Sequence, residues 1–144
     1  MSATSGPRKS VPSGVVMRRI VNPITVYLGG PTLVVRGRKT GRLLATPVPA
    51  FSFGGARHLV GGRGETHWAR NLRAAGEGEY RERGRREPFR AVELFGAERE
   101  QVLAAYRERH GRRVRALFDE LPNPEQHPVF RIEPLQPAER AVGV

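Results

Sequence analysis

The sequence predicts an α+β domain whose strands form a mostly antiparallel sheet or barrel. Short apolar, β-branched runs follow one another closely and are separated by glycines, as in antiparallel strands joined by tight turns. One short and one long helical stretch interrupt these runs, and a last strand-like run closes the chain. A length of 144 residues fits a single domain.

The ends of the chain are expected to lie outside the core. Residues 1–13 lack the apolar region of a secretory signal and are predicted to form a disordered tail. Helical spacing follows in residues 14–30 until Pro23, which ends or kinks the helix. This basic segment either packs on the domain or makes peripheral contact with a membrane surface. The domain is expected over 14–136, with a loose tail over 137–144.

The first three strands are expected over residues 31–37, 42–55 and 56–62. The first is a β-branched run, which favours a strand. The second contains Pro47 and Pro49, which have no N–H to donate and confine that strand to a sheet edge or a bulge. It ends at Gly54 and Gly55, a hairpin signal that leads into the third strand.

The remaining elements are expected over 64–76 (helix), 77–84 and 87–96 (a strand pair), 97–121 (helix) and 127–135 (strand). Thr66 is expected to cap the first helix and Gly76 to end it. Arg85 and Arg86 are expected at the turn of the strand pair. Gly111 is expected to divide the long helical stretch into two helices.

The charge balance indicates an anionic partner. The net charge is +11 and the isoelectric point is about 11.5. Such a charge favours nucleic acid, a membrane surface or a polyanionic small molecule, although an arginine-rich genome composition also produces it. Aromatic residues are only 7%, which argues against a nucleic-acid binder, because such proteins stack bases on aromatics. With no cysteine and four scattered histidines, we predict no metal site.

The stretch "RGRKTGR" over 36–42 concentrates four cations in seven residues. The glycine spacing of a Walker A loop is missing, and no GxGxxG lies between a strand and a helix. Gly37 and Gly41 permit a tight turn in which backbone amides and cations converge on an anion. The alternative is a solvated hairpin tip.

A second stretch, "GGRGETHWARNLRAAG" over 61–76, places a glycine-rich turn and Arg63 before a helix N-terminus, which favours anions. Trp68, Asn71 and Leu72 share one face of that helix. A buried Asn71 needs hydrogen-bond partners, either neighbouring backbone or a ligand.

Together, "GRKTGRLLATP" (37–47) and "HWARNLRAAG" (67–76) resemble the deazaflavin-dependent nitroreductase family of split β-barrel oxidoreductases, which use coenzyme F-420. The closing "HPVFRIEP" is also similar, and the resemblance runs from about Pro31 to Pro134. It implies a split β-barrel with an N-terminal helix, and hydride transfer to a small apolar acceptor, such as an enone, a quinone or a nitro compound. The implied cofactor is coenzyme F-420 in preference to FMN.

The resemblance also implies site residues. Cations of the 36–42 loop would grip the anionic tail of the cofactor, Arg63 its phosphate, and the glycine turn, Trp68 and Asn71 its ring. The cofactor-binding residues implied are Arg38, Lys39, Thr40, Gly41, Arg42, Pro47, Gly62, Arg63, Trp68 and Asn71.

On the acceptor side, the family's nitro-reducing members carry tyrosines where this chain has Val114, Leu117 and Phe118. Tyr106 is therefore the candidate catalytic proton donor, with solvent as the alternative source. Its spacing with Val102 and Leu103 also fits a core position. The pocket is expected to prefer enones and quinones over nitro compounds.

Two other functions remain open: a non-catalytic barrel that binds the cofactor or a fatty acid, and a basic binder of nucleic acid or membranes. We expect a cytoplasmic protein, with membrane association as an alternative, and a monomer or a homodimer. No nucleic-acid partner is expected.

Overall fold

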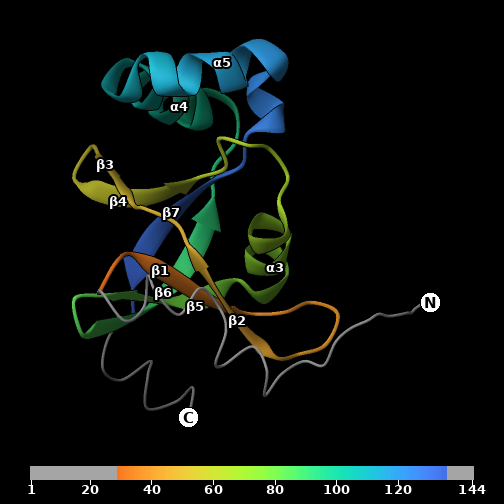
Figure 1. Cartoon of the computed structure of the whole chain (residues 1–144), viewed down its shortest axis with the longest axis vertical. Helices are drawn as coiled ribbons and strands as arrows, with labels where there is room; N and C mark the ends of the chain where they lie inside the picture. The colour runs from red at the N-terminus through yellow and green to blue at the C-terminus, as the bar shows by residue number, and fades with distance from the viewer. Residues whose placement is uncertain (1–28, 136–144) are drawn as a thin grey trace.

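One antiparallel sheet of seven strands organises the domain in a computed structural model that describes residues 29–135 (Figure 1). The strands are β1 (Thr32–Arg36), β2 (Leu43–Pro47), β3 (Phe51–Phe53), β4 (Ala56–Val60), β5 (Glu77–Glu82), β6 (Arg85–Glu93) and β7 (Val129–Pro134). Their order is β2-β1-β5-β6-β7-β4-β3, and every pair is antiparallel. The sheet curls into an open half-barrel, so the predicted α+β split β-barrel is confirmed.

Helices lie at two ends of this sheet. The helices of the described residues are α3 (His67–Ala75), α4 (Gly96–His110), α5 (Arg112–Glu120) and the short 3-10 helix η1 (Pro124–Gln126). Helix α3 packs against β1, β5 and β6, whereas α4 packs against β3, β7 and α5 (Figure 1). The two helical regions therefore cover different parts of the half-barrel.

The single strand predicted over 42–55 is wrong. Strand β2 ends at Pro47, β3 begins at Phe51, and the two lie at opposite edges of the sheet. Pro47 and Pro49 have no N–H for a ladder, so the chain leaves one edge between them and crosses to the other. The edge position expected for this proline-containing run is confirmed.

The turn between β5 and β6 comes earlier than predicted. Arg83 and Gly84 form it, with φ angles of 53° and 80°, and two consecutive positive φ values are typical of a type I′ hairpin. Arg85 and Arg86, which were expected at the turn, belong to β6. Gly84 tolerates the left-handed conformation that a tight hairpin needs, and so decides where the strand ends.

The expectations about helix ends have mixed outcomes. Gly76 ends α3 in a left-handed conformation with φ of 75°, as predicted, and its N–H donates to the Leu72 carbonyl at 2.8 Å. Gly111 separates α4 from α5, also as predicted. Thr66 occupies the N-cap position, but its side chain makes no capping bond. Its hydroxyl oxygen is buried without a partner, so the predicted cap is wrong.

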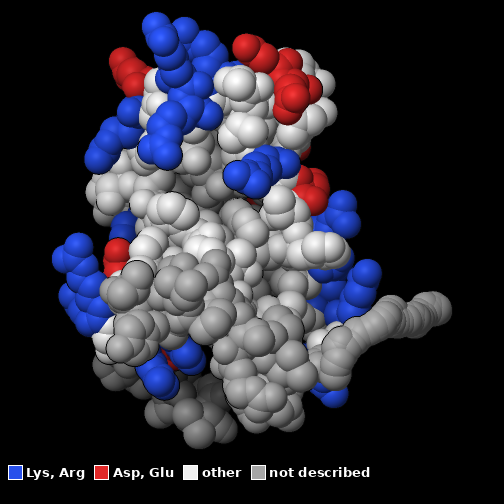
Figure 2. Space-filling view, viewed as in Figure 1, with Lys and Arg blue, Asp and Glu red and all other residues white. Residues whose placement is uncertain are grey.

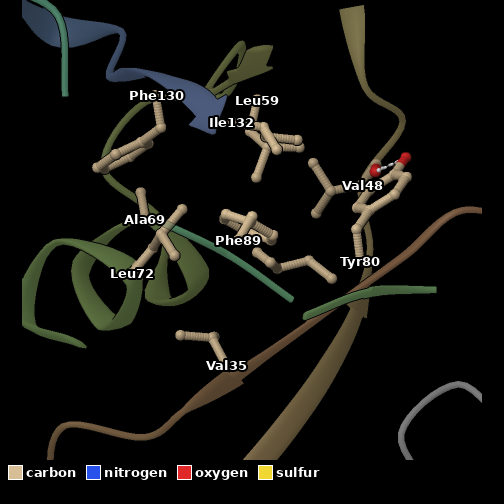
Figure 3. Packing of buried hydrophobic residues seen from close by; sticks show 10 residues of the cluster. Val35, Val48, Leu59, Ala69, Leu72, Tyr80, Phe89, Phe130 and Ile132 are labelled. Atoms are coloured by element: carbon tan, nitrogen blue, oxygen red, sulfur yellow. Dashed lines mark hydrogen bonds between the residues drawn. The ribbon is translucent and has the colours of Figure 1, made fainter. Parts of the chain in front are cut away.

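Two clusters of buried apolar side chains fill the domain. The first lies between the sheet and α3 (Figure 3) and contains Leu33, Val35, Val48, Leu59, Ala69, Leu72, Tyr80, Phe89, Phe130 and Ile132. The second lies against α4 and α5 and contains Phe51, Val60, Leu94, Val102, Leu103, Val114, Phe118 and Val129. Strands β4 and β7 contribute to both clusters, so they join the two cores.

The tail predicted over 1–13, the helix predicted within 14–30 and the tail over 137–144 fall outside the described residues. Between residues 29 and 135, no helix is long and apolar enough to cross a membrane. The same part of the chain contains no group of three His, Asp or Glu residues that could hold a metal ion.

Tyr80 fixes the crossing between β2 and β3. Its hydroxyl donates to the Val48 carbonyl at 2.9 Å (Figure 3) and accepts from the Ala50 N–H at 2.9 Å. Burial is the main reason that the pKa of Tyr80 rises to about 12, so the hydroxyl keeps its proton. We predict that Tyr80→Phe lowers the free energy of unfolding by about 1–3 kcal/mol, because both backbone groups lose their partner. Urea unfolding measures this; an unchanged midpoint would contradict it.

Candidate functional site

The loop over residues 36–42 joins β1 to β2 and closes on itself. The Gly37 N–H donates to the Arg42 carbonyl at 2.7 Å, and the Gly41 N–H donates to the Gly37 carbonyl at 2.9 Å. The Arg42 N–H donates to the Thr40 hydroxyl oxygen at 3.2 Å. These amides are therefore used within the loop, and the expected nest of free backbone donors is wrong for Gly37, Gly41 and Arg42. An anion here must be held mainly by side-chain charge.

A buried amide anchors this loop to α3. Asn71 is only 3% exposed, and its Oδ1 accepts from the Arg38 N–H at 3.0 Å and from Arg38 Nη1 at 2.7 Å. Asn71 thus bonds the loop through both the backbone and the side chain of Arg38. The exposed Arg36 guanidinium bends along the loop and donates to the Gly41 carbonyl.

Lys39 and Arg42 are the cations of this loop whose side chains stay exposed and make no hydrogen bond or ion pair with the described residues. The other two cations of the loop are engaged with protein oxygens. Because an unpaired, exposed cation is free to meet a ligand, Lys39 and Arg42 are the members of the predicted set best placed to contact an anion. The basic side chains on the side of α3 and β2 are visible in Figure 2.

The N-terminus of α3 lies beside the cations of the loop. Burial is the main reason that the pKa of His67 falls below its usual value, and the charges of Arg38, Lys39 and Arg70 lower it further. The first turn of α3 contains no acidic residue. A helix N-terminus carries a partial positive charge. Loop and helix therefore create one positive field, in which a bound anion would be stabilised.

Sequence reasoning missed Arg70 and His67 as parts of this field. They lie three residues apart and so share a face of α3, next to the face of Trp68, Asn71 and Leu72. A helical projection of α3 contains this signal, but only the structure shows that the face meets the loop.

Trp68 forms a wall of the first core cluster. Its ring centroid is 6.2 Å from that of Phe130, and the side chain is half-buried against the cluster. The shared face expected for Trp68, Asn71 and Leu72 is present. Pro47 is distant from the loop: it pairs with Thr32, at the opposite end of the β1–β2 ladder from Arg36 and Leu43.

The glycine turn over residues 61–64 passes close to the helices on the far side. A Cβ at Gly61 would lie 2.8 Å from Pro128 Cγ, which leaves no room for a side chain. A Cβ at Gly62 would lie 3.5 Å from Tyr106 Oη and 3.6 Å from Leu117 Cδ1. The backbone of the turn therefore faces the side chains of α4 and α5. Arg63, in the same turn, is exposed.

An ion-pair cluster lies where the glycine turn leads into α3. Arg73 donates to both carboxylate oxygens of Glu65, at 3.0 and 2.8 Å, and to both of Glu93, at 2.8 Å each. These bonds raise the pKa of Arg73, and the bond from Arg73 is the main reason that the pKa of Glu65 is lowered. The cluster ties the start of α3 to its last turn and to β6, although solvent screens it.

Tyr106 belongs to the second cluster but keeps its hydroxyl near the turn. Its ring packs edge to face on Phe51, with centroids 5.3 Å apart, and lies 4.5 Å from the ring of His110. Burial raises the pKa of Tyr106, so the phenol stays protonated at neutral pH. Tyr106 therefore packs in the core, as its spacing indicated. Its hydroxyl still lies near the glycine turn, where the proposed role as proton donor would need it.

A comparison with known protein families identifies a relationship over most of the chain. Residues 15–117 match the family model described as F420H(2)-dependent quinone reductase. A comparison with curated proteins gives no match.

Solved structures share the fold. "Structure of F420-H2 Dependent Reductase (FDR-A)" aligns with a TM-score of 0.57 at 23% identity, over 72% of this chain and 93% of that one. A structure titled as a domain-swapped dimer aligns with a TM-score of 0.56 at 20% identity, over 83% and 91%. HutZ, a heme storage protein from Vibrio cholerae, aligns with a TM-score of 0.51 at 18% identity, over 81% and 91%. At these identities the likeness shows the fold alone.

The anchoring role of Asn71 is testable without a ligand. Asn71→Ala removes the acceptor of two Arg38 donors, so we predict a loss of about 1–3 kcal/mol in the free energy of unfolding and faster hydrogen exchange at the Arg38 amide. Asn71→Asp keeps an acceptor oxygen and should preserve the slow exchange. Equal exchange at Arg38 in the alanine variant and the wild type would argue against the anchor.

Proposed function

The chain belongs to the F420H(2)-dependent quinone reductase family, an oxidoreductase family that depends on reduced deazaflavin, and on this premise we propose that it reduces small, flat, apolar acceptors. Enones and quinones are the proposed classes, in preference to nitro compounds. The family match covers residues 15–117, so the resemblance and the deazaflavin cofactor inferred from the sequence are confirmed.

The observation that carries the proposal is the junction of the loop with α3. A deazaflavin of this type bears a phosphate and a chain of carboxylates, which require several cations along a groove. Lys39 and Arg42 are exposed beside a helix N-terminus that lacks acidic residues, with His67 and Arg70 on the same side. The buried, unpartnered Thr66 hydroxyl oxygen lies at that N-terminus. These donors fit an anionic cofactor.

The glycine turn and the helices would form the acceptor side. When bound, the deazaflavin supplies the hydride, and the chain supplies binding, orientation and exclusion of water. Gly62 presents bare backbone opposite Tyr106 and Leu117, and Val114 and Phe118 add apolar surface behind them. The protonated Tyr106 hydroxyl is the proposed donor of the proton that the reduced acceptor needs. A pocket with few hydrogen-bond donors disfavours the anionic intermediates of nitro reduction.

The loop cations should determine affinity for the cofactor. We predict that Lys39→Ala/Arg42→Ala weakens deazaflavin binding on the order of 10- to 1000-fold, because each charge-assisted bond contributes at most about 1.5–3 kcal/mol and exposed ones less. The difference should shrink in high salt. Fluorescence titration measures it. Arg109→Ala/Arg113→Ala, with the same charge change on α4 and α5, is the control. Equal affinity of the loop variant and wild type at low salt would refute this prediction.

Tyr106→Phe tests the proton donor. We expect kcat for a quinone or enone to fall on the order of 100-fold, with deazaflavin affinity unchanged, in a steady-state panel of acceptors. Tyr80→Phe, which removes a hydroxyl that bonds only backbone, is the matched control. An unchanged kcat would assign the proton to solvent. Fast nitro reduction abolished by Tyr106→Phe would contradict the proposed acceptor class. Tight cofactor or fatty-acid binding without any turnover would favour a non-catalytic barrel.

The oligomeric state, monomer or homodimer, stays a prediction. The cytoplasmic location, with or without membrane association, also stays a prediction.

A further inference from the structure

His127 joins the glycine turn to the end of α5. The imidazole is completely buried and lies between two backbone carbonyls. Its Nδ1 is 3.1 Å from the Gly61 oxygen, and its Nε2 is 2.6 Å from the Leu121 oxygen. Gly61 is also held from the other side, because its N–H donates to the Pro128 carbonyl at 2.7 Å.

The chemistry of these contacts restricts the state of the ring. A carbonyl oxygen only accepts hydrogen bonds, and a neutral imidazole donates from one nitrogen alone, whereas an imidazolium donates from both. A neutral ring would therefore hold one carbonyl and direct a lone pair at the other. Leu121 follows the last residue of α5, and the partial negative charge at a helix C-terminus stabilises a cation there.

The surroundings of the ring are apolar on one face. Phe118 stacks on His127 with centroids 4.0 Å apart and an interplanar angle of 18°. From α4, the guanidinium of Arg107 lies 5.0 Å from the centre of the Phe118 ring. Within the described residues, the ring forms hydrogen bonds with backbone carbonyls alone. Those two oxygens and the helix end must therefore offset both the burial of a charge and the positive charge of Arg107 beside Phe118.

The connection joins the two sides of the proposed acceptor site. Gly61 precedes Gly62, whose backbone faces Tyr106 and Leu117, and Leu121, just past the end of α5, lies four residues after Leu117. A Cβ at Gly64 would lie 3.0 Å from Leu121 Cδ1. The ring therefore bridges the glycine turn and the C-terminal end of α5.

We propose that His127 is a positioning residue: as a doubly donating imidazolium it ties the Gly61 carbonyl to the Leu121 carbonyl and thereby fixes the distance between the glycine turn and Tyr106. Its catalytic consequence rests on the proposed reductase function. The tie itself is a property of the fold and is open to a test that needs no cofactor.

The first test is nitrogen NMR of the full chain with ¹⁵N-labelled histidine at neutral pH. We expect both ring nitrogens of His127 to carry a slowly exchanging hydrogen; the signals are assigned by their loss in His127→Phe. A His127 ring with one unprotonated nitrogen would overturn the two-sided tie. This measurement uses the wild type, so it stands even where variants fail to fold.

The second test separates the two bonds. The side-chain amide of Asn can replace Nδ1 and that of Gln can replace Nε2, so His127→Asn keeps the bond to the turn and His127→Gln keeps the bond to the helix. We expect each to lower kcat for the acceptor on the order of 10-fold, with deazaflavin affinity within about twofold. His127→Gln should also speed amide exchange at Gly62.

The control is His58→Gln. His58 is buried too, but its ring approaches one carbonyl, that of Phe51, at 3.4 Å, so we expect a lower Tm with unchanged kcat. His127 variants that lose only Tm and retain wild-type kcat and Gly62 exchange would overturn the positioning role. A wild type that turns over no acceptor would reject the reductase proposal, while the NMR and Gly62 exchange would still decide the tie.

Discussion

The two hydrogen bonds from Arg38 to the amide oxygen of Asn71 hold the basic loop in place, and the charge arrangement of the molecule depends on them. Four cations within seven residues repel one another, and a loop free to move would spread them. Asn71 draws Arg38 inward and Arg36 turns back on Gly41. Lys39 and Arg42 then remain outward beside α3, so one buried polar side chain converts a repulsive loop into an organised cationic surface.

The domain contains two cores, and each supports a different part of the candidate site. The first, between the sheet and α3, supports the basic loop and the start of α3. The second carries α4 and α5, with Tyr106 and Leu117 against it. Strands β4 and β7 run through both, and the glycine turn leaves the end of β4 between them. A ligand contacting both regions would therefore sense any change in their relative position.

Much of the fold was predictable because local signals were strong. The glycine pair at 54–55, the ends of α3 and α4 at Gly76 and Gly111, and the face of Trp68, Asn71 and Leu72 follow from backbone conformation or helical spacing. The split of residues 42–55 into strands at opposite edges was not predictable, because the Tyr80 hydroxyl that bonds the backbone of the crossing lies 30 residues beyond Ala50. The proline pair was visible, but its consequence is set by tertiary contacts.

The candidate site shows the same limit. Motif spacing selected the loop, the glycine turn and Asn71, yet gave no means of deciding whether Asn71 bonds backbone or ligand. Its partner, Arg38, is 33 positions away. His67, Arg70 and His127 were passed over because a lone histidine or arginine carries no pattern. What makes each of them notable is a neighbour brought close by the sheet.

An open barrel has edge strands with unpaired backbone groups, whereas a closed barrel has none. The described sheet ends at β2 and β3, and a free strand edge invites pairing with another chain. Strand β2 is short, carries a 44% exposed Leu43, and ends at Pro47. The cations Lys39 and Arg42 come just before it in the chain. The charges suited to an anionic ligand thus also discourage edge-to-edge joining of two copies, so the binding surface doubles as protection against aggregation.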